Sequence, residues 1–166
     1  MKKWKLGFIA LVSIVLVLAA CSNTDDNAKT NNKQNETKQQ ETMKPSKNKQ
    51  FKLKNRVDFL GLIVTFEKAT YLQNDKGVKD SVLKVDMNVE NNSATPRGFT
   101  TINMEISDKD GKKLTIYPGE NLGEKIEPGK TIHGSGYFAV NGKGPYTISY
   151  KDQDSDVQAS WKVEVK

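Results

Sequence analysis

Apolar and polar residues alternate along most of the chain from residue 51 to residue 166. A period of two is typical of β-strands, because successive side chains point to opposite faces of a sheet. The alternation is cleanest at residues 83–89, 146–150 and 157–165, which predicts three half-buried strands. Residues 60–66 carry apolar side chains at both sets of positions, which predicts a strand that is covered on both faces.

Clusters of Gly, Pro, Asn and Asp separate these strands and predict turns. Residues 108–111 (DKDG) have the composition of a tight hairpin turn, and in residues 127–130 (EPGK) Pro and Gly suit the central positions of a turn. Residues 118–129 are expected to form the longest irregular stretch. No segment shows an apolar stripe at the helical period. The pattern therefore predicts an all-β fold, an antiparallel β-sandwich of seven to nine strands.

Three details refine this fold. Trp161 lies in the last alternating segment and is expected at the centre of the core. Gly134 and Gly136 lie on the apolar face of the strand predicted at residues 132–140, where they leave room for a bulky neighbour or for a ligand. The apolar positions 99 and 102 are out of phase with each other, which predicts a bulge or an irregular start to that strand.

The first residues have the layout of a cleaved export signal. Lysines at positions 2, 3 and 5 precede an uncharged and mostly apolar run at residues 6–20, which ends at Cys21. A helix of this length spans only about 22 Å, against roughly 30 Å for the hydrocarbon core of a bilayer. An uncleaved membrane anchor is therefore the weaker alternative.

The residues LAAC at positions 18–21 resemble the lipobox of bacterial lipoproteins. This resemblance implies that Cys21 carries a diacylglycerol and a palmitate-like acyl chain, and that the signal peptide before it is removed. The rest of the chain would then lie on the extracellular side of the cell membrane, with the membrane as a partner through the lipid on Cys21. Because Cys21 is the only cysteine, no intrachain disulfide can form.

Composition divides the remaining chain into two parts. Residues 22–50 contain no aromatic residue and no Val, Ile or Leu, so they cannot bury enough apolar surface to offset the entropy of ordering. We therefore predict a signal peptide at residues 1–20, a lipidated, disordered Asn/Gln/Lys-rich tether at residues 21–50, and one domain at residues 51–166. A domain of this length can form one self-standing core.

Most of the net charge of +6 lies outside the predicted domain. Three lysines belong to the signal peptide, and residues 22–50 carry six lysines against four acids. The predicted domain keeps a net charge of only about one, so it lacks the focused basic surface that phosphate-backbone binding needs. Nucleic acid is therefore excluded as an expected partner.

Residues that could carry chemistry are few. Asp152, Asp154 and Asp156 have the first three ligand spacings of a calcium loop, but Val157 and Val163 replace the glycine and glutamate that such a loop requires. A cation site and a solvated turn both remain open for these aspartates. His133, the only histidine, is expected to point to solvent. We expect no metal site, no cofactor and no catalytic residue, although a pair of converging carboxylates remains an open alternative.

Three segments carry a resemblance to a known family: residues 87–93 (MNVENNS), 106–111 (ISDKDG) and 126–140 (IEPGKTIHGSGYFAV). Together they resemble uncharacterised domains of Gram-positive surface lipoproteins, similar to the family of the mycobacterial secreted immunoprotective antigen. Members of this family are sometimes mislabelled as telomeric repeat-binding factors. The resemblance implies an immunoglobulin-like sandwich and a surface location, and it supplies no catalytic or binding residue.

Two functional classes follow from these expectations. The first is a non-catalytic binding module at the cell envelope, which engages an envelope protein, a peptide or a cell-wall polymer through loops or a sheet face. The second is an envelope enzyme, or an enzyme accessory, that acts on cell-wall material. Candidate contact stretches are residues 73–80, 92–98 and 118–128, since loops on a rigid scaffold often carry function. Two roles remain open for four tyrosines, which either contact a ligand or pack in the core: Tyr117, Tyr137, Tyr146 and Tyr150.

Overall fold

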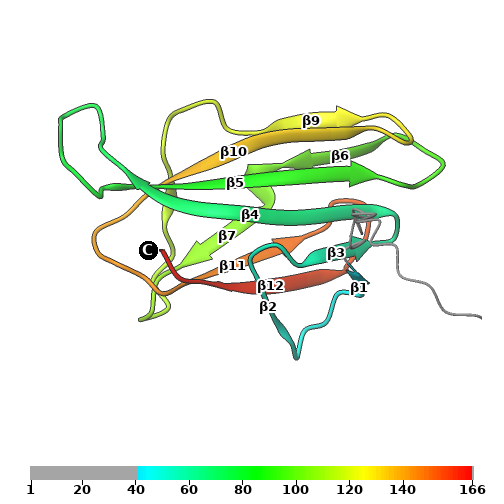
Figure 1. The fold of residues 1–166 in the computed structure, drawn as a ribbon, viewed down its shortest axis with the longest axis horizontal. Helices are drawn as coiled ribbons and strands as arrows, with labels where there is room; N and C mark the ends of the chain where they lie inside the picture. Colours follow the sequence, from blue (N-terminus) through cyan, green and yellow to red (C-terminus); the bar gives the residue numbers. More distant parts are fainter. Residues whose placement is uncertain (1–40, 166) are drawn as a thin grey trace, which may run out of the picture. The chain divides into compact units, whose positions relative to one another are not determined.

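The computed structural model describes residues 41–165, which form twelve β-strands and one short 3-10 helix (Figure 1). The signal peptide, Cys21 and most of the predicted tether lie outside the described residues. The first strands are β1 (Thr42–Met43), β2 (Gln50–Lys52), β3 (Arg56–Phe59), β4 (Leu62–Leu72) and β5 (Val82–Asn91). Next come β6 (Arg97–Thr100), the 3-10 helix η1 (Thr101–Asn103), β7 (Met104–Ser107) and β8 (Thr115–Ile116). The last are β9 (Gly123–Ile126), β10 (Thr131–Ala139), β11 (Tyr146–Lys151) and β12 (Gln158–Val163).

The strands form two main sheets that face each other across one core. The larger sheet has the order β1-β3-β4-β5-β10-β8, and the smaller one has the order β2-β12-β11-β7. Strands β6 and β9 form a separate two-stranded sheet. All neighbours are antiparallel except β1 with β3 and β2 with β12. The predicted antiparallel β-sandwich is therefore confirmed, and two-residue strands such as β1 and β8 raise the strand number above the expected one.

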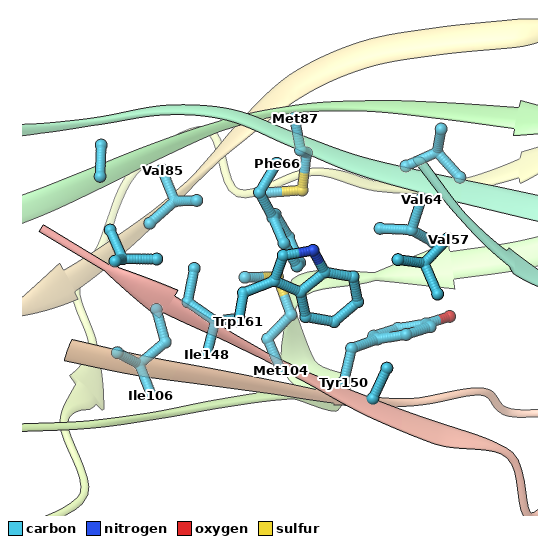
Figure 2. Packing of buried hydrophobic residues seen from close by; sticks show 14 of the residues in the cluster. Val57, Val64, Phe66, Val85, Met87, Met104, Ile106, Ile148, Tyr150 and Trp161 are labelled. Atoms are coloured by element: carbon cyan, nitrogen blue, oxygen red, sulfur yellow. The ribbon is translucent and has the colours of Figure 1, made fainter. Parts of the chain in front are cut away.

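Trp161 lies at the centre of the core, as predicted, and its side chain is fully buried. Figure 2 shows its indole between the side chains of the larger sheet and those of β11 and β7. The Phe66 ring meets it edge to face, with ring centroids 4.7 Å apart, and the Phe51 ring lies 5.6 Å away. Such aromatic pairs contribute about 0.5–1.5 kcal/mol beyond the burial of their area. The aromatic cluster thus fixes the two sheets against each other.

The space beside the two glycines of β10 is filled by protein. A Cβ atom at Gly134 would lie 2.8 Å from Cδ1 of Leu122, and one at Gly136 would lie 3.0 Å from Cγ2 of Thr101. Protein side chains therefore occupy this space, but they come from η1 and from the segment before β9, whereas the bulky-neighbour alternative expected them from the facing sheet. The phase break between positions 99 and 102 is the helix η1, through which the chain passes from β6 to β7.

Two expectations about segments need correction. Residues 118–129 were expected to be irregular, but Gly123–Ile126 form β9, which pairs with β6. The pattern hides this strand because its first three residues are all exposed. Residues Thr42–Met43 fall in the predicted tether, yet they pair with β3, so ordered structure begins before residue 51. In the part of the chain that the structure describes, no helix is long and apolar enough to span a membrane.

Candidate functional site

The two ends of the sandwich differ in how they use charged residues. One end carries the β4–β5 loop, the β7–β8 hairpin turn and the β10–β11 loop, and we call it the hairpin end (Figure 1). The opposite end carries the β3–β4, β5–β6, β9–β10 and β11–β12 turns, and we call it the arginine end after Arg97.

The β7–β8 turn is the hairpin turn that the sequence predicts. Oδ1 of Asp108 accepts hydrogen bonds from the backbone amides of Asp110 (3.0 Å) and Lys112 (2.9 Å). Gly111 takes a φ of +79°, which a residue with a Cβ rarely adopts, and its amide donates to the carbonyl of Asp108. The carboxylate of Asp108 is thus occupied by its own turn and holds it in a fixed shape.

The β10–β11 loop is held by two tyrosines at the edge of the core, Tyr71 and the buried Tyr146. The hydroxyl oxygens of Tyr71 and Tyr146 lie 3.2 Å apart, and the amide of Gly144 donates to the Tyr71 hydroxyl over 2.8 Å. Tyr146 in turn donates to the carbonyl of Gly142. Burial, together with the bond to Tyr71, raises the pKa of Tyr146, so this phenol stays protonated and the chain of bonds persists at any physiological pH.

A hollow of about 380 Å³ lies between these two rigid loops. Its floor includes Tyr146, and four lysines line its walls: Lys109, Lys112, Lys113 and Lys143. Lys109 pairs with the exposed carboxylate of Asp110, and Lys113 pairs with Glu105. Among the described residues, the other two lysines have no ion-pair partner. The hollow therefore presents uncompensated positive charge on a fixed frame.

A second hollow, of about 240 Å³, adjoins the first on the side of the smaller sheet. The two share Asp108, Lys109 and Tyr146, and the second adds Lys162 of β12. Lys162 stands directly opposite Lys52 of β2 in the strand register. We call this connected set the lysine track; its members are Lys52, Lys162, Lys109, Lys112, Lys113 and Lys143.

At the arginine end, charged side chains are buried and paired with one another. Nη2 of Arg97 donates to both carboxylate oxygens of Asp152, at 2.8 and 3.0 Å, and Nε donates to Asp154 at 2.7 Å. Nη1 of Arg97 also donates to the carbonyl of Leu60. Burial alone would lower the pKa of the Arg97 guanidinium, but its bonds to Asp154 and Asp152 outweigh burial and raise the pKa. One side chain thus joins the β3–β4, β5–β6 and β11–β12 segments.

This arrangement corrects the expectation of a solvated turn, because Asp152 is buried and paired. Asp152 is fully buried against Arg97, Asp154 binds the same guanidinium, and the exposed Asp156 pairs with Lys151 at 2.8 Å. The three carboxylates therefore face two different cations of the protein, and no group of three potential metal ligands occurs among the described residues. The geometry favours a structural turn.

Tyr150 shows how tightly the arginine end is packed. Its ring stacks on Phe99 with centroids 5.2 Å apart and meets Phe59 edge to face at 5.0 Å. Its hydroxyl is buried without a hydrogen-bond partner in the described chain. Burial, followed by the neighbouring charge of Asp152, raises the pKa of Tyr150. Tyr150 is thus part of the core and makes no surface contact.

The motif that ends β5 in Asn91 also serves the structure of this end. The Asn91 side chain is fully buried, donates to the carbonyls of Thr95 and Ile126, and accepts from the amide and hydroxyl of Ser93. Its backbone carbonyl accepts from the amide of Gly129, which has a φ of +72° in the predicted Pro-Gly turn. Asn91 and the Pro-Gly turn thus join the segment at residues 87–93 to the segment at residues 126–140.

The candidate contact stretches fall in different places. Residues 73–80 lie at the hairpin end, where the hydroxyl of Tyr117 donates to Asp75 over 2.6 Å. Residues 92–98 lie at the arginine end and include the buried Arg97, and residues 118–128 include β9. His133 is exposed on the outer face of β10, as expected. Two other tyrosines of the candidate set serve packing, since Tyr146 is buried and Tyr137 lies against Gly119.

The sequence reasoning missed both the lysine track and the role of Arg97. The net charge of the whole domain predicted no focused basic surface, because a sum over all residues does not show that lysines gather at one end. Three lysines of the track are visible as a cluster in residues 108–113 (DKDGKK), which was considered only as a turn. The remaining lysines come from β2, β12 and the β10–β11 loop, which are distant in the sequence. Arg97 stands 55 residues before Asp152, and no local pattern marks that pairing.

Solved structures with the same fold differ widely from this chain in sequence. The yjhA protein from Bacillus subtilis is 18% identical, with a TM-score of 0.54 over 69% of this chain and 99% of that one. The ycdA protein from Bacillus subtilis, described as a candidate lipoprotein, is 19% identical with a TM-score of 0.53 over 62% of this chain. The matched region is only 36% of the ycdA chain. The secreted protein MPT63 from Mycobacterium tuberculosis is 13% identical, with a TM-score of 0.45 over 74% of this chain and 98% of that one.

At these identities, the likeness to the two Bacillus proteins shows a shared β-sandwich fold. No protein-family model matches the chain, and no curated protein is close enough in sequence to count as a relative. The function must therefore be argued from the residues of the site.

Proposed function

We propose that this protein is a lipid-anchored extracellular binding module, which uses the hairpin end of its sandwich to engage an envelope protein or a cell-wall polymer and carries out no catalysis. The anchor would be the lipid on Cys21. Two features support this location: the export-signal pattern that ends in LAAC, and the fold shared with a candidate lipoprotein. Membrane attachment would keep the module at the cell surface, since two or more acyl chains give stable anchoring.

The observation that carries the binding role is the lysine-lined hollow at the hairpin end. Short loops present its lysines, and Asp108, Tyr71 and Tyr146 hold those loops in place. A rigid frame lowers the entropy that must be lost when a partner binds. At the opposite end, the charged groups that join the turns, Arg97 and Asp152, are buried and paired, so they do not face a partner.

Site-specific photo-crosslinking on intact cells tests the binding role. A photoreactive amino acid replaces Lys143 in the hollow or, as the matched control, the exposed Lys125 on β9. We expect a specific adduct from position 143 and only background from position 125. Equal capture from both positions, or no capture from position 143, would contradict the proposed site.

Fractionation of cells that express Cys21→Ala tests the anchor, with Ser22→Ala as the matched control. We expect the Cys21→Ala chain to keep its signal peptide and to lack the lipid, and the Ser22→Ala chain to be processed like the wild type. Identical mass and membrane extraction for all three chains would contradict lipidation at Cys21.

A further inference from the structure

We propose that the ligand of the lysine track is a linear polyanion, an extended chain that carries phosphate or carboxylate groups at short intervals. The inference rests on the proposed function only in that the track is taken to be a binding surface. It goes further because it names the chemistry of the ligand and the residues that contact it. Three properties of the track support it: its extended shape, its uncompensated charge and its choice of lysine.

The shape of the track fits an extended ligand. The two hollows join across Lys109 and Tyr146, so that the cationic groups follow one another from the β10–β11 loop to β2. Four separate segments contribute lysines: β2, the β7–β8 turn, the β10–β11 loop and β12. A single small anion would contact only one or two of them, whereas a chain of charges can contact all of them at once.

The charge of the track is only partly compensated by the protein. Lys109 pairs with Asp110 and Lys113 with Glu105, whereas Lys52, Lys112 and Lys143 have no ion-pair partner among the described residues. Asp108 lines both hollows and contributes one negative charge, while its Oδ1 accepts from two backbone amides of its own turn. Lys162 stands opposite Lys52, and like charges that face each other across strands destabilise a sheet. The carboxylate of Glu164 lies 3.6 Å from Lys162, a long contact between exposed groups. An anionic chain would supply the negative charge that the track lacks.

The outer face of the larger sheet shows the contrast. There, Arg56 donates to Glu90 at 2.7 Å, and Lys84 lies 2.9 Å from Asp86. The hydroxyl of Ser135 adds a further bond to Asp86. Arg56 and Lys84 on that face are thus paired with direct neighbours, in contrast to Lys112 and Lys143 of the track.

The track consists of lysines alone, and this choice indicates the mode of recognition. Lysine acts as a compact point charge on a flexible stem, whereas arginine offers a planar fork for bidentate contact. Such a surface would bind regularly spaced charges through counterion release, with little demand on the exact geometry of each group. Phosphate and carboxylate polymers share this chemistry, and the experiment separates them.

The test measures binding of fluorescently labelled inorganic polyphosphate to the full chain in phosphatidylcholine nanodiscs, with poly-L-glutamate and orthophosphate as parallel probes. The variant Lys112→Gln with Lys143→Gln removes the two lysines of the first hollow that lack an ion-pair partner. Its control, Lys125→Gln with Lys130→Gln, removes the same charge from exposed positions outside the track. Circular dichroism of each variant confirms that the fold is kept.

For the wild type we expect affinity for at least one polymer, and a fall of about a hundredfold between 50 and 200 mM salt, as for roughly five ionic contacts. The track variant should lose about tenfold in affinity, and the control less than twofold. The preferred polymer assigns the ligand to phosphate or to carboxylate. Orthophosphate at millimolar concentration should compete only weakly.

Three results would overturn the inference: no binding of either polymer, an equal loss in both variants, or full competition by orthophosphate at the same concentration of charge. Loss of the polymer signal when a third of the lipid is phosphatidylglycerol would assign the track to the bilayer and would overturn it as well. If any of these results is obtained but position 143 still gives a specific protein adduct on cells, the proposed binding role is kept and only the polyanion ligand is rejected.

Discussion

The two ends of the sandwich use charge in opposite ways. At the arginine end, Arg97 is 9% exposed and Asp152 is fully buried, and their bonds connect three turns. At the hairpin end, the lysines are exposed, and the bonds that fix the loops come from Asp108 and the tyrosines. The difference separates two roles. Charges that are buried and paired hold the fold together, whereas charges that are exposed and unpaired on a rigid frame are available to a ligand.

This division has an energetic consequence. Removing one partner of a buried ion pair leaves an uncompensated charge and costs several kcal/mol, whereas an exposed pair contributes about 0–1 kcal/mol. Substitutions at the arginine end should therefore change stability, and substitutions at the hairpin end should change binding. The predictions below test this contrast.

The largest effect is expected for Arg97→Met, because it leaves Asp152 buried without its partner. The free energy of unfolding, measured by urea denaturation, should fall by about 3–5 kcal/mol. The matched control is Arg56→Met, which breaks the half-exposed pair with Glu90 and should cost about 1 kcal/mol or less. Equal losses for the two variants would show that Arg97 is no more structural than a surface residue.

A smaller loss is expected for Asn91→Ala, since its side chain satisfies the carbonyls of Thr95 and Ile126. Leaving buried polar groups without partners should lower the free energy of unfolding by about 1–3 kcal/mol. The adjacent Asn92 is exposed, and Asn92→Ala should cost less than about 0.5 kcal/mol. If Asn91→Ala left the free energy of unfolding unchanged, other contacts would have to hold the β5–β6 and β9–β10 turns.

Leu60→Asn should stabilise the arginine end. Leu60 has a φ of +55° at the tip of the β3–β4 hairpin, where its side chain is 67% exposed, and Gly61 follows with a φ of +97°. Asn tolerates this left-handed backbone better than Leu, and Asn-Gly is a favoured pair for such a turn. Thermal unfolding should report a gain of about 0.5–1 kcal/mol. A loss of stability would show that the Leu60 side chain makes a contact worth more than the strain.

The smallest effect on stability is expected for Lys52→Gln, and this variant separates a binding role from a structural one most clearly. Relief of the repulsion from Lys162 should raise the free energy of unfolding by about 0.2–0.5 kcal/mol while polyanion affinity falls. Lys125→Gln should change neither quantity. Opposite changes in stability and affinity are the mark of a residue kept for binding, and changes of the same sign would argue for a structural role.

Much of the fold could be predicted from the sequence, because period-two alternation directly reports burial on one sheet face. It placed β5, β11 and β12 well, and it put Trp161 in the core. It missed β9, whose exposed Gly123, Glu124 and Lys125 carry no apolar signal, and it missed the pairing of β1 with β3.

The candidate site was less accessible to sequence reasoning. Asp152 and Asp154 pair with the guanidinium of Arg97, and only the folded chain brings Arg97 near them. The local sequence around the two aspartates therefore could not distinguish this pairing from a metal site. The lysine track likewise arises from strand register and loop placement, since Lys52 and Lys162 meet only through the β2–β12 pairing. The lipid on Cys21 lies outside the described residues and stays a prediction.

The most direct test of the division between the two ends is a polyphosphate titration of the full chain in nonionic detergent micelles, with ¹⁵N-labelled lysine observed by nuclear magnetic resonance. The account predicts salt-sensitive shifts at Lys109, Lys112, Lys143 and Lys162, and unchanged signals at Lys125 and Lys130. Shifts of similar size at all these lysines, or shifts confined to Lys125 and Lys130, would contradict it.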